Sequence, residues 1–257
     1  MSTMRTREMA RLTWPEVQEA IQAGAGVVLP VGSTEQHGLH LPLATDAILA
    51  TDLAMAIAEP ANMLVAPAIQ YGYRSRPLTG GGQGFVGTTS VSARTLMSVC
   101  EDVLAELVRQ GFRRIAVLNW HFENAGFVYE AAYVATESSA GSGARVLVLE
   151  QAFADLSAAT MDALFPEGFP GWGIEHASIF ETSLMLHLHP ELVLFDRAVD
   201  DAAKRSPWYD VVPTPDAFVP RSGTLWKATQ ASADKGALAW PEVVAQVREA
   251  IELELPA

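Results

Sequence analysis

Side chains that commonly bind metal ions gather in two short segments of the chain. The stretch VGSTEQHGLHLPLATDA (31–47) contains four of them: Glu35, His37, His40 and Asp46. The stretch LNWHFEN (118–124) contains two more: His121 and Glu123. Imidazole and carboxylate together suit ions such as Zn²⁺ and Mn²⁺. With only six histidines in the chain, this concentration is a first indication of a metal site.

Within each segment a glutamate and a histidine are separated by one residue. Residues i and i+2 of an extended chain point to the same side, so each segment can present one His and one Glu together. Each segment also follows an aliphatic run, 26–30 or 115–118, that is typical of a buried strand. Ligands of open α/β sheets bind beyond the carboxyl ends of the strands. Asp46, at the start of the next predicted helix, can reach the same crevice.

The charges of this group also favour metal ions. Glu35, Asp46 and Glu123 would place three negative charges in one cleft, and these two segments contain no Arg or Lys. Buried unpaired charges are costly, and two divalent cations with a bound hydroxide would balance them. We expect each ion to take one His and one Glu, with Asp46 as the bridge. A metal pair lowers the pKa of water and polarises carbonyls, which predicts a hydrolase; the alternative is a set of solvated loop side chains.

The remaining histidines divide into two kinds. We expect His40 not to be a ligand, and His187 and His189, on or after a late helix, to be structural or exposed. His176 differs because it follows a Gly/Pro-rich loop (166–173) that also carries Trp172. Such a loop can close over a substrate beside a metal site. The alternative is that His176 merely helps the following helix to begin.

Strands alternate with helices along the chain, which predicts an α/β fold with a mainly parallel sheet covered on both faces. The expected strands are 27–31, 63–67, 115–118 and 145–149. The first expected helix begins after Thr13, and the others are 45–57, 90–109, 124–138, 155–164, 182–187 and 241–253. A long Gly-rich loop separates two of these elements at 70–90. We interpret residues 1–257 as one domain.

Composition excludes several classes of protein. The chain has 257 residues, of which 49% are hydrophobic, so a disordered protein is not expected. The net charge of −13 disfavours nucleic-acid binding. We see neither a run of about 18 apolar residues, as a membrane span needs, nor the apolar segment of a secretory signal. The single cysteine, Cys100, is expected in the core. These features predict a cytoplasmic protein without membrane or nucleic-acid partners.

Several motifs together resemble the creatininase (creatinine amidohydrolase) family. They are GSTEQHGLHLPLATD, QYGYRSRPLTGGGQGFVGTTS, NWHFEN, FPEGFPGWGIEH, EHASIFETSLML and GTLWKATQASADKG, and they run along the whole chain. The resemblance implies a three-layer α/β/α fold and hydrolysis of a small-molecule amide. It also implies a centre of two divalent metal ions per chain, Zn²⁺ and/or Mn²⁺, and a homohexamer.

The resemblance further implies a role for each site residue. One metal would be held by Glu35, Asp46 and His121. The other would be held by His37, Asp46 and Glu123. The catalytic groups would be Glu123, which helps to take a proton from water, and His176, which protonates the leaving nitrogen. A metal-bridging hydroxide would attack the carbonyl carbon, opening creatinine to creatine. Glu175 and Glu181 would orient the ligands or His176.

The residues expected to contact the substrate are Thr79, Phe122, Trp172, Gly173 and His176. Some depart from the family pattern: Gly173 stands in place of Asp, Phe122 in place of Tyr, and Thr79 in place of Ser. The segment 150–153 also lacks a second Trp. These departures keep alternatives open. One is a family amidohydrolase with another substrate, either the formamide of a pyrimidine intermediate or a peptide bond in cofactor maturation. The other is a catalytically silent metal-binding protein.

Overall fold

A parallel β-sheet forms the centre of the computed structural model, which describes residues 4–153 and 155–256. Its strands are β1 (Gly26–Val31), β2 (Met63–Val65), β3 (Arg114–Asn119) and β4 (Arg145–Leu149). They lie in the order β2-β1-β3-β4, and every neighbouring pair is parallel. All six residues of β1 are buried, because helices cover both faces of a parallel sheet and select continuous aliphatic runs.

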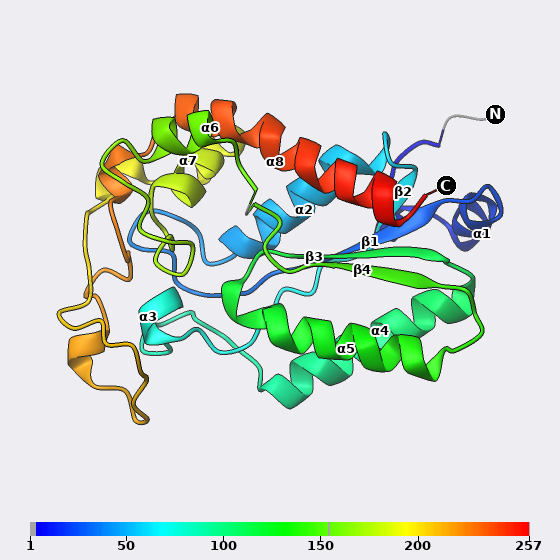
Figure 1. Cartoon of the computed structure of the whole chain (residues 1–257), viewed down its shortest axis with the longest axis horizontal. Helices are drawn as coiled ribbons and strands as arrows, with labels where there is room; N and C mark the ends of the chain where they lie inside the picture. The colour runs from blue at the N-terminus through cyan, green and yellow to red at the C-terminus, as the bar shows by residue number, and fades with distance from the viewer. Residues whose placement is uncertain (1–3, 154, 257) are drawn as a thin grey trace.

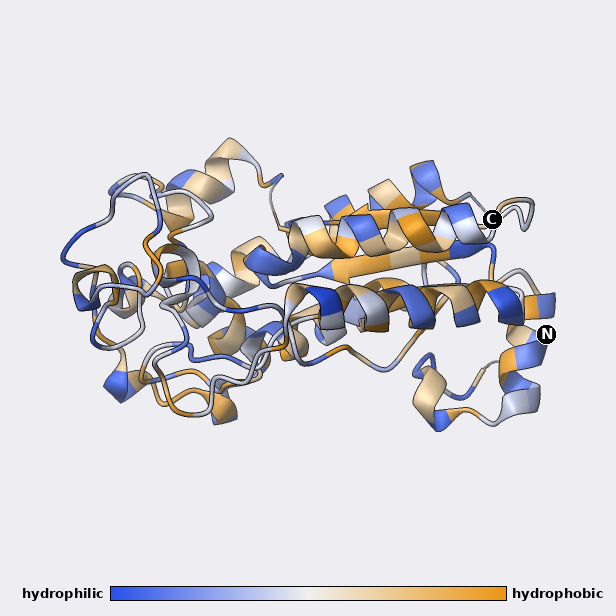
Figure 2. Cartoon of the chain, turned by 90° about the horizontal axis from the view of Figure 1, so that it is seen from below, coloured by the Kyte–Doolittle hydropathy of each residue, from blue (hydrophilic) through white to orange (hydrophobic). Residues whose placement is uncertain are grey.

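Helices form a layer on each face of the sheet (Figure 1). One layer contains α2 (Thr45–Ala58), α6 (Ala158–Leu164), α7 (Ile179–Leu188) and α8 (Ala233–Glu254). The other contains α1 (Trp14–Gln22), α4 (Ala93–Gln110) and α5 (Ala125–Ser138). Alternate residues of β1 enter different cores, with Val28 in the first and Val27 and Leu29 in the second, as the strand period of two requires. The predicted three-layer α/β fold is confirmed, and Figure 2 shows the hydrophobic sheet between amphipathic helices.

Local sequence signals set several helix ends. The Thr13 backbone N–H donates to the Glu16 carboxylate at 2.6 Å, which completes the predicted capping box of α1. Ser92 caps α4 by accepting the N–H of Thr95 at 3.3 Å. Gly111 ends α4 with φ of 114°, a left-handed conformation that glycine adopts without steric cost. Because α4 ends at Gly111, the chain can turn and begin β3 at Arg114.

Other boundaries differ from the sequence prediction. Helix α8 begins at Ala233, where Ser232 accepts the N–H of Lys235 at 3.2 Å, and not at Pro241. The proline lies inside the helix on its exposed side, where water can satisfy the carbonyl that loses its N–H partner. The late helix predicted from 182 begins at Ile179. The Gly-rich loop includes a short helix, α3 (Pro77–Gly80).

The segments that follow the carboxyl ends of β1 and β3 gather with α3 and α7 at one end of the molecule, on the left in Figure 1. This end contains both predicted ligand segments. Among the residues that the structure describes, no helix combines the length and apolarity that a bilayer crossing requires.

Candidate metal centre

The predicted ligands come together beyond the carboxyl ends of the strands. Glu35 and His37 follow β1, and Asp46 lies in the first turn of α2. His121 and Glu123 follow β3. All five side chains are buried, although each is polar or charged. A buried group of this kind needs compensating charge.

Asp46 lies between the two histidines. Its Oδ1 is 3.1 Å from Nε2 of His37, and its Oδ2 is 3.2 Å from Nδ1 of His121. Glu35 Oε1 lies 2.9 Å from the same His121 nitrogen. One donor atom each from Glu35, Asp46 and His121 lies within 4.8 Å of the other two, a spacing that could hold an ion. This is the first ligand set that the family resemblance implies.

The carboxylates beside His37 include one that the expected second set does not contain. Carboxylate oxygens of Asp46 and Glu181 lie within 4.0 Å of His37 Nε2, that of Glu181 at 3.7 Å. These three residues form another group with metal-binding spacing. The structure therefore places Glu181, and not Glu123, beside His37.

Glu123 lies beside the other ring nitrogen of His121, the one that does not meet Glu35 and Asp46. Its Oε2 is 3.5 Å from Nε2 of His121. Its Oε1 accepts hydrogen bonds from the Thr79 hydroxyl and from the Arg76 backbone N–H, the latter at 3.0 Å. One oxygen of Glu123 is therefore held by the Gly-rich loop, and the other is available to the cavity.

Backbone carbonyls orient both ligand histidines. His37 Nδ1 donates to the carbonyl of Glu35 at 3.1 Å, and His121 Nε2 donates to the carbonyl of Tyr73 at 3.0 Å. Each ring therefore turns its other nitrogen toward Asp46. Partners of this kind fix the tautomer and the ring orientation of histidines that ligate metals.

The carboxylates of this cluster raise the pKa values of its two histidines, which indicates a site that needs positive charge. Burial by itself would lower the pKa of His37, but the charges of Asp46 and Glu181 raise it to about 10. Burial by itself would also lower the pKa of His121, but the charge of Glu35 outweighs burial, and the pKa of His121 is raised. The imidazoles would carry protons where cations are absent. Glu35 Oε2 and Asp46 Oδ2 are buried without a hydrogen-bond partner, so the donor set fits divalent metal ions.

His176 lies against this group. Its Nε2 donates to the carbonyl of Gln36 at 2.8 Å, and its Nδ1 lies 3.8 Å from Glu35 Oε1. Its ring centroid is 4.4 Å from that of His37. Burial, reinforced by the His37 charge, lowers the pKa of His176 and so favours the neutral ring. His176 also has metal-binding spacing to Glu35 and His37.

A small cavity of about 20 Å³ opens onto these side chains, which is room for roughly one water molecule. Its aromatic walls are Trp120, Phe122, Phe153 and Trp172, and Thr79 lies among them. The ring of Trp172 packs 4.9 Å from Phe153, which occupies the segment without a second Trp. A Cβ on Gly173 would lie 3.3 Å from Thr79 Cγ2 and 3.7 Å from Phe122 Cζ. The predicted substrate-contacting residues therefore surround one cavity.

Two further glutamates lie where α7 begins. Glu175 Oε1 accepts the N–H of Phe180 at 2.8 Å, and Glu181 Oε2 accepts the N–H of Ala177 at 2.7 Å. Burial raises the pKa of Glu175 to about 8 and that of Glu181 to about 7. Both carboxyls line the cavity. Each of the two carboxyl groups therefore contacts both the backbone at the start of α7 and the cavity of the metal centre.

The other histidines are not part of the cluster. His40 is buried and contacts the hydroxyl of Thr182 at 2.8 Å. His187 is exposed. His189 Nε2 lies 2.6 Å from Asp52 on α2. These positions agree with the structural roles expected for them.

Sequence reasoning missed some residues that shape the centre. Asn124 accepts the backbone N–H of Tyr73 at 2.8 Å and so holds the residue whose carbonyl orients His121. Its place directly after the His-x-Glu pair was the available signal. Gln36 contacts His176. In an extended chain its side chain points to the side opposite those of Glu35 and His37, so the sequence pattern did not indicate this contact.

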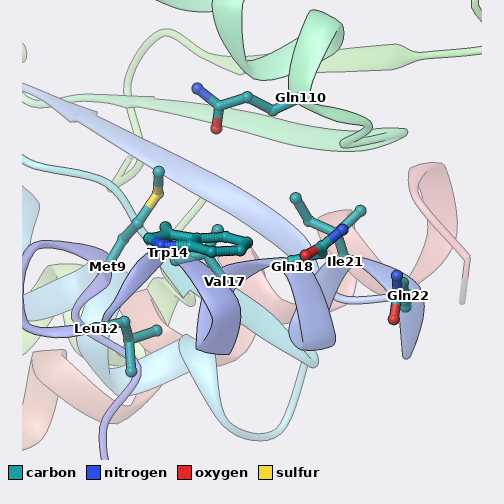
Figure 3. A pocket seen from close by; sticks show the side chains of 8 residues that line it. All are labelled: Met9, Leu12, Trp14, Val17, Gln18, Ile21, Gln22 and Gln110. Atoms are coloured by element: carbon teal, nitrogen blue, oxygen red, sulfur yellow. The ribbon is translucent and has the colours of Figure 1, made fainter.

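A larger groove of about 620 Å³ lies beside α1 (Figure 3), at the end of the molecule opposite α3 and α7 in Figure 1. The ring of Trp14 lies along it between Met9 and Ile21. Its lining consists of apolar and amide side chains, without a titratable or metal-binding group. The small cavity, and not this groove, therefore carries the chemistry.

Known proteins are similar to this chain in both sequence and fold. The creatininase family, described as creatinine amidohydrolase, matches residues 10–251. The creatinine amidohydrolase of Pseudomonas putida is 41% identical over 252 residues, covering 96% of this chain and 97% of that protein. The mycofactocin precursor peptide peptidase of Mycobacterium ulcerans is 31% identical over 245 residues, covering 90% of this chain and 82% of that protein. A solved structure described as "Creatininase Mn" has a TM-score of 0.93 and 39% identity, covering 98% of this chain and 100% of that one.

Proposed function

Since the chain belongs to the creatinine amidohydrolase family, we propose that it hydrolyses the cyclic amide of creatinine, or of a close relative, to the open-chain product. The protein is an amidohydrolase of this family, and the finer statement concerns its substrate and its metals. The 41% identity over nearly the whole of both chains favours creatinine over more distant substrates.

The observation that carries the proposal is the position of Asp46 between His37 and His121, at 3.1 and 3.2 Å. A carboxylate that meets two imidazoles through its two oxygens is suited to bridge two divalent ions. Glu35 supplies a further oxygen at 2.9 Å from His121. We assign Glu35, Asp46 and His121 to one ion, and His37 and Asp46 to the other. The donor chemistry suits Zn²⁺ or Mn²⁺, and the similar creatininase structure is described with Mn.

The carboxylate that completes the second set has two candidates. The family resemblance implies Glu123, and the distances favour Glu181, which lies 3.7 Å from His37 Nε2. Bound at these sets, metal ions supply an activated water and a polarised carbonyl. The protein's own groups hold the substrate and move protons.

Two side chains can move those protons. Glu123 Oε2 is free of the Gly-rich loop, so it can accept the first proton from the attacking water and release it to solvent at the end of the cycle. His176 is neutral, with Nδ1 directed toward the centre. It can take the second proton of that water and pass it to the leaving nitrogen as the C–N bond breaks. General acid–base catalysis of this kind contributes about 10²- to 10⁴-fold to a rate.

The cavity favours a flat substrate. Its walls are aromatic rings, and Gly173 leaves space opposite Phe122. Trp172 packs edge-on against Phe180 at 5.3 Å and closes one side. Flat aromatic walls suit a heterocycle, and the relative named as a creatinine amidohydrolase is 41% identical, against 31% for the relative named as a peptide peptidase.

Proton NMR of creatinine mixed with the Zn²⁺- or Mn²⁺-loaded protein tests the proposal. Creatine should accumulate, and a chelator should stop the reaction. A protein that keeps two ions per chain without producing creatine would contradict creatinine as the substrate. A panel containing a formylated aminopyrimidine and a short peptide would then separate the two alternative hydrolases. Inertness toward the whole panel would support a silent metal-binding protein.

Two broader features are also proposals. The family resemblance implies a homohexamer, which light scattering coupled to size-exclusion chromatography would test. A cytoplasmic location would be tested by fractionating cells that express the protein.

A further inference from the structure

The side-chain amide of Gln36 joins three loops around the metal centre. Its Nε2 donates to the carbonyl of Gly80 at 3.0 Å and to the carbonyl of Gly223 at 2.9 Å. Its Oε1 accepts the N–H of Gly38 at 2.9 Å. The amide is buried. Gln36 therefore links the ligand loop, the Gly-rich loop and the loop that precedes α8.

These partners determine which way the amide points. An NH₂ group has two hydrogens and cannot accept, and an amide oxygen can only accept. Reversing the amide would place its oxygen against the carbonyls of Gly80 and Gly223, and its NH₂ group against the N–H of Gly38. The observed orientation satisfies all three contacts. Both hydrogens of Gln36 Nε2 are therefore already used.

The surrounding backbone packs tightly on this amide. A Cβ on Gly223 would lie 1.7 Å from Gln36 Oε1, and a Cβ on Gly81 would lie 2.5 Å from Gln36 Nε2. Both glycines have positive φ, 87° and 76°. Neither loop could approach so closely with a side chain at these positions. The fit fixes Gln36 and, with it, the peptide group that follows.

That peptide group is the partner of His176. The ring nitrogen Nε2 of His176 lies 2.8 Å from the carbonyl oxygen of Gln36 and 2.9 Å from its Nε2. Because the amide has no hydrogen left to donate, the hydrogen between the two residues must be on His176 Nε2. It is donated to the Gln36 carbonyl. His176 Nδ1 is then the unprotonated nitrogen, 3.8 Å from Glu35 Oε1.

We propose that Gln36 is a positioning residue that holds His176 in its Nε2–H tautomer, so that Nδ1 faces the metal centre. The tautomer matters because only a nitrogen with a free lone pair can accept a proton from the attacking water. This inference rests on the proposed function for the reaction that His176 serves. The tautomer itself follows from the contacts, whichever amide is the substrate.

Long-range proton–nitrogen NMR of the zinc-loaded protein, with ¹⁵N-labelled histidine, measures the tautomer directly. The His176 signals are those that disappear in His176→Ala. We expect the unmodified protein to show a protonated Nε2 and an unprotonated Nδ1. Gln36→Met keeps the length of the side chain but removes its donors and its acceptor. We expect this variant to show a mixture of tautomers and to keep two ions per chain.

Kinetics of the same variant supply a second readout. We expect Gln36→Met to lower kcat by about 10-fold or more, with KM changed by less than about threefold, because proton transfer is affected and binding is not. Gln83→Met is the matched control. That glutamine also links backbone and side-chain groups of the Gly-rich loop, at 3.4 Å to Ser75 O and 3.1 Å to Ser90 Oγ, away from His176. It should leave both the spectrum and kcat unchanged.

Two results would overturn the proposal. One is a proton on Nδ1 of His176 in the unmodified protein, which decides the matter even if Gln36→Met does not fold. The other is a Gln36→Met protein with an unaltered spectrum and an unaltered kcat. An Nε2–H tautomer in a protein that leaves creatinine untouched would support the positioning role and contradict the proposed substrate, so the two failures are distinguishable.

Discussion

The carbonyl of Tyr73 accepts a hydrogen bond from Nε2 of His121 at 3.0 Å, and this contact decides which ring nitrogen meets the carboxylates. Tyr73 is held in turn by Asn124, whose Oδ1 accepts the Tyr73 backbone N–H at 2.8 Å. Asn124 Nδ2 donates to the carbonyl of Gly32 at 3.0 Å, just after β1. One amide therefore connects the loop of Tyr73 to the end of the sheet and orients a ligand that it does not touch.

We expect Asn124→Leu to weaken metal binding by about 10- to 100-fold, as loss of the partners that orient a ligand usually does. Zinc titration against a chelating dye measures this effect. Asn62→Gly is a suitable control because Asn62 lies in a turn before β2, with a φ of 51° that glycine tolerates. Equal zinc affinity in Asn124→Leu and the unmodified protein would contradict the orienting role.

Asp46→Asn should lose both ions, because the two oxygens of Asp46 face both histidines. An amide offers one neutral oxygen in their place, so one of the two contacts loses its acceptor. Elemental analysis after dialysis gives the metal content per chain. Asp52→Asn removes a carboxylate from the same helix, where Asp52 pairs with His189 at 2.6 Å, and should keep both ions. Two ions retained in Asp46→Asn would exclude the bridging role.

His176→Ala should retain two ions and lose about 10²-fold or more in kcat, because the residue is proposed to move a proton and not to hold a metal. Metal content and steady-state rates on the same preparation test both parts. His187→Ala changes an exposed histidine of α7 and should leave both quantities unchanged. Loss of an ion in His176→Ala would instead make His176 a ligand, since it has metal-binding spacing to Glu35 and His37.

The sequence was sufficient to predict the sheet and most of the ligand cluster. Aliphatic runs mark buried parallel strands, and the His-x-Glu and Glu-x-His pairs follow two strands that prove to be neighbours, β1 and β3. Local periodicity and the rule for strand ends were enough to bring Glu35, His37 and His121 together.

The sequence did not predict contacts that depend on how distant segments pack. Glu181 reaches His37 because α7 begins at Ile179. The predicted helix, starting at 182, did not include Glu181, and only the family resemblance implied a role for this residue beside the ligands. Gln36 alternates away from the ligands, and its partners, Gly80 and Gly223, lie in loops far along the chain. No local pattern carries information of this kind.

Two glutamate variants should separate the candidate ligands of the second ion. We expect Glu181→Gln to bind one ion tightly and the second about 10- to 100-fold more weakly, because a neutral amide replaces a carboxylate near His37. Glu123→Gln should bind both ions and turn over slowly, since Glu123 lies beside the other ring nitrogen of His121. Isothermal titration with zinc measures both affinities. The reverse pattern would support the ligand set that the family resemblance implies.

Substitution of Gly173 should reveal how closely the cavity fits its substrate. A Cβ at this position would lie 3.3 Å from Thr79 Cγ2, which is a tight contact, and 3.7 Å from Phe122. We expect Gly173→Ala to raise KM by several-fold, on the order of 1 kcal/mol of lost binding, with metal content unchanged. Gly84→Ala, in open space on the Gly-rich loop, is the control. An unchanged KM would place the substrate away from Gly173.

The metal-free protein should lose stability as the pH rises from 6 to 9. Charges of neighbouring carboxylates raise the pKa of His37 to about 10 against the burial that opposes them, and the pKa of His121 is also raised, whereas 6.5 is ordinary for the unfolded chain. The folded state therefore binds more protons than the unfolded state above pH 6.5, and its stability falls as pH rises through the folded pKa. Glu175 and Glu181 act in the same direction, because burial raises their pKa values to about 8 and about 7 from 4.5.

Asp46 and His176 have the opposite sign, because His37 lowers the pKa of Asp46 despite burial and burial lowers that of His176. Their contributions change mainly at or below the ordinary pKa of each group in the unfolded chain, 3.8 and 6.5. Urea unfolding of chelator-treated protein at pH 6 and pH 9 measures the net effect. Metal ions would take the place of the protons on His37 and His121, so the loaded protein should show a smaller fall, and metal affinity should rise with pH. If the metal-free protein were more stable at pH 9 than at pH 6, the histidines would not be supplying the positive charge that the buried carboxylates need.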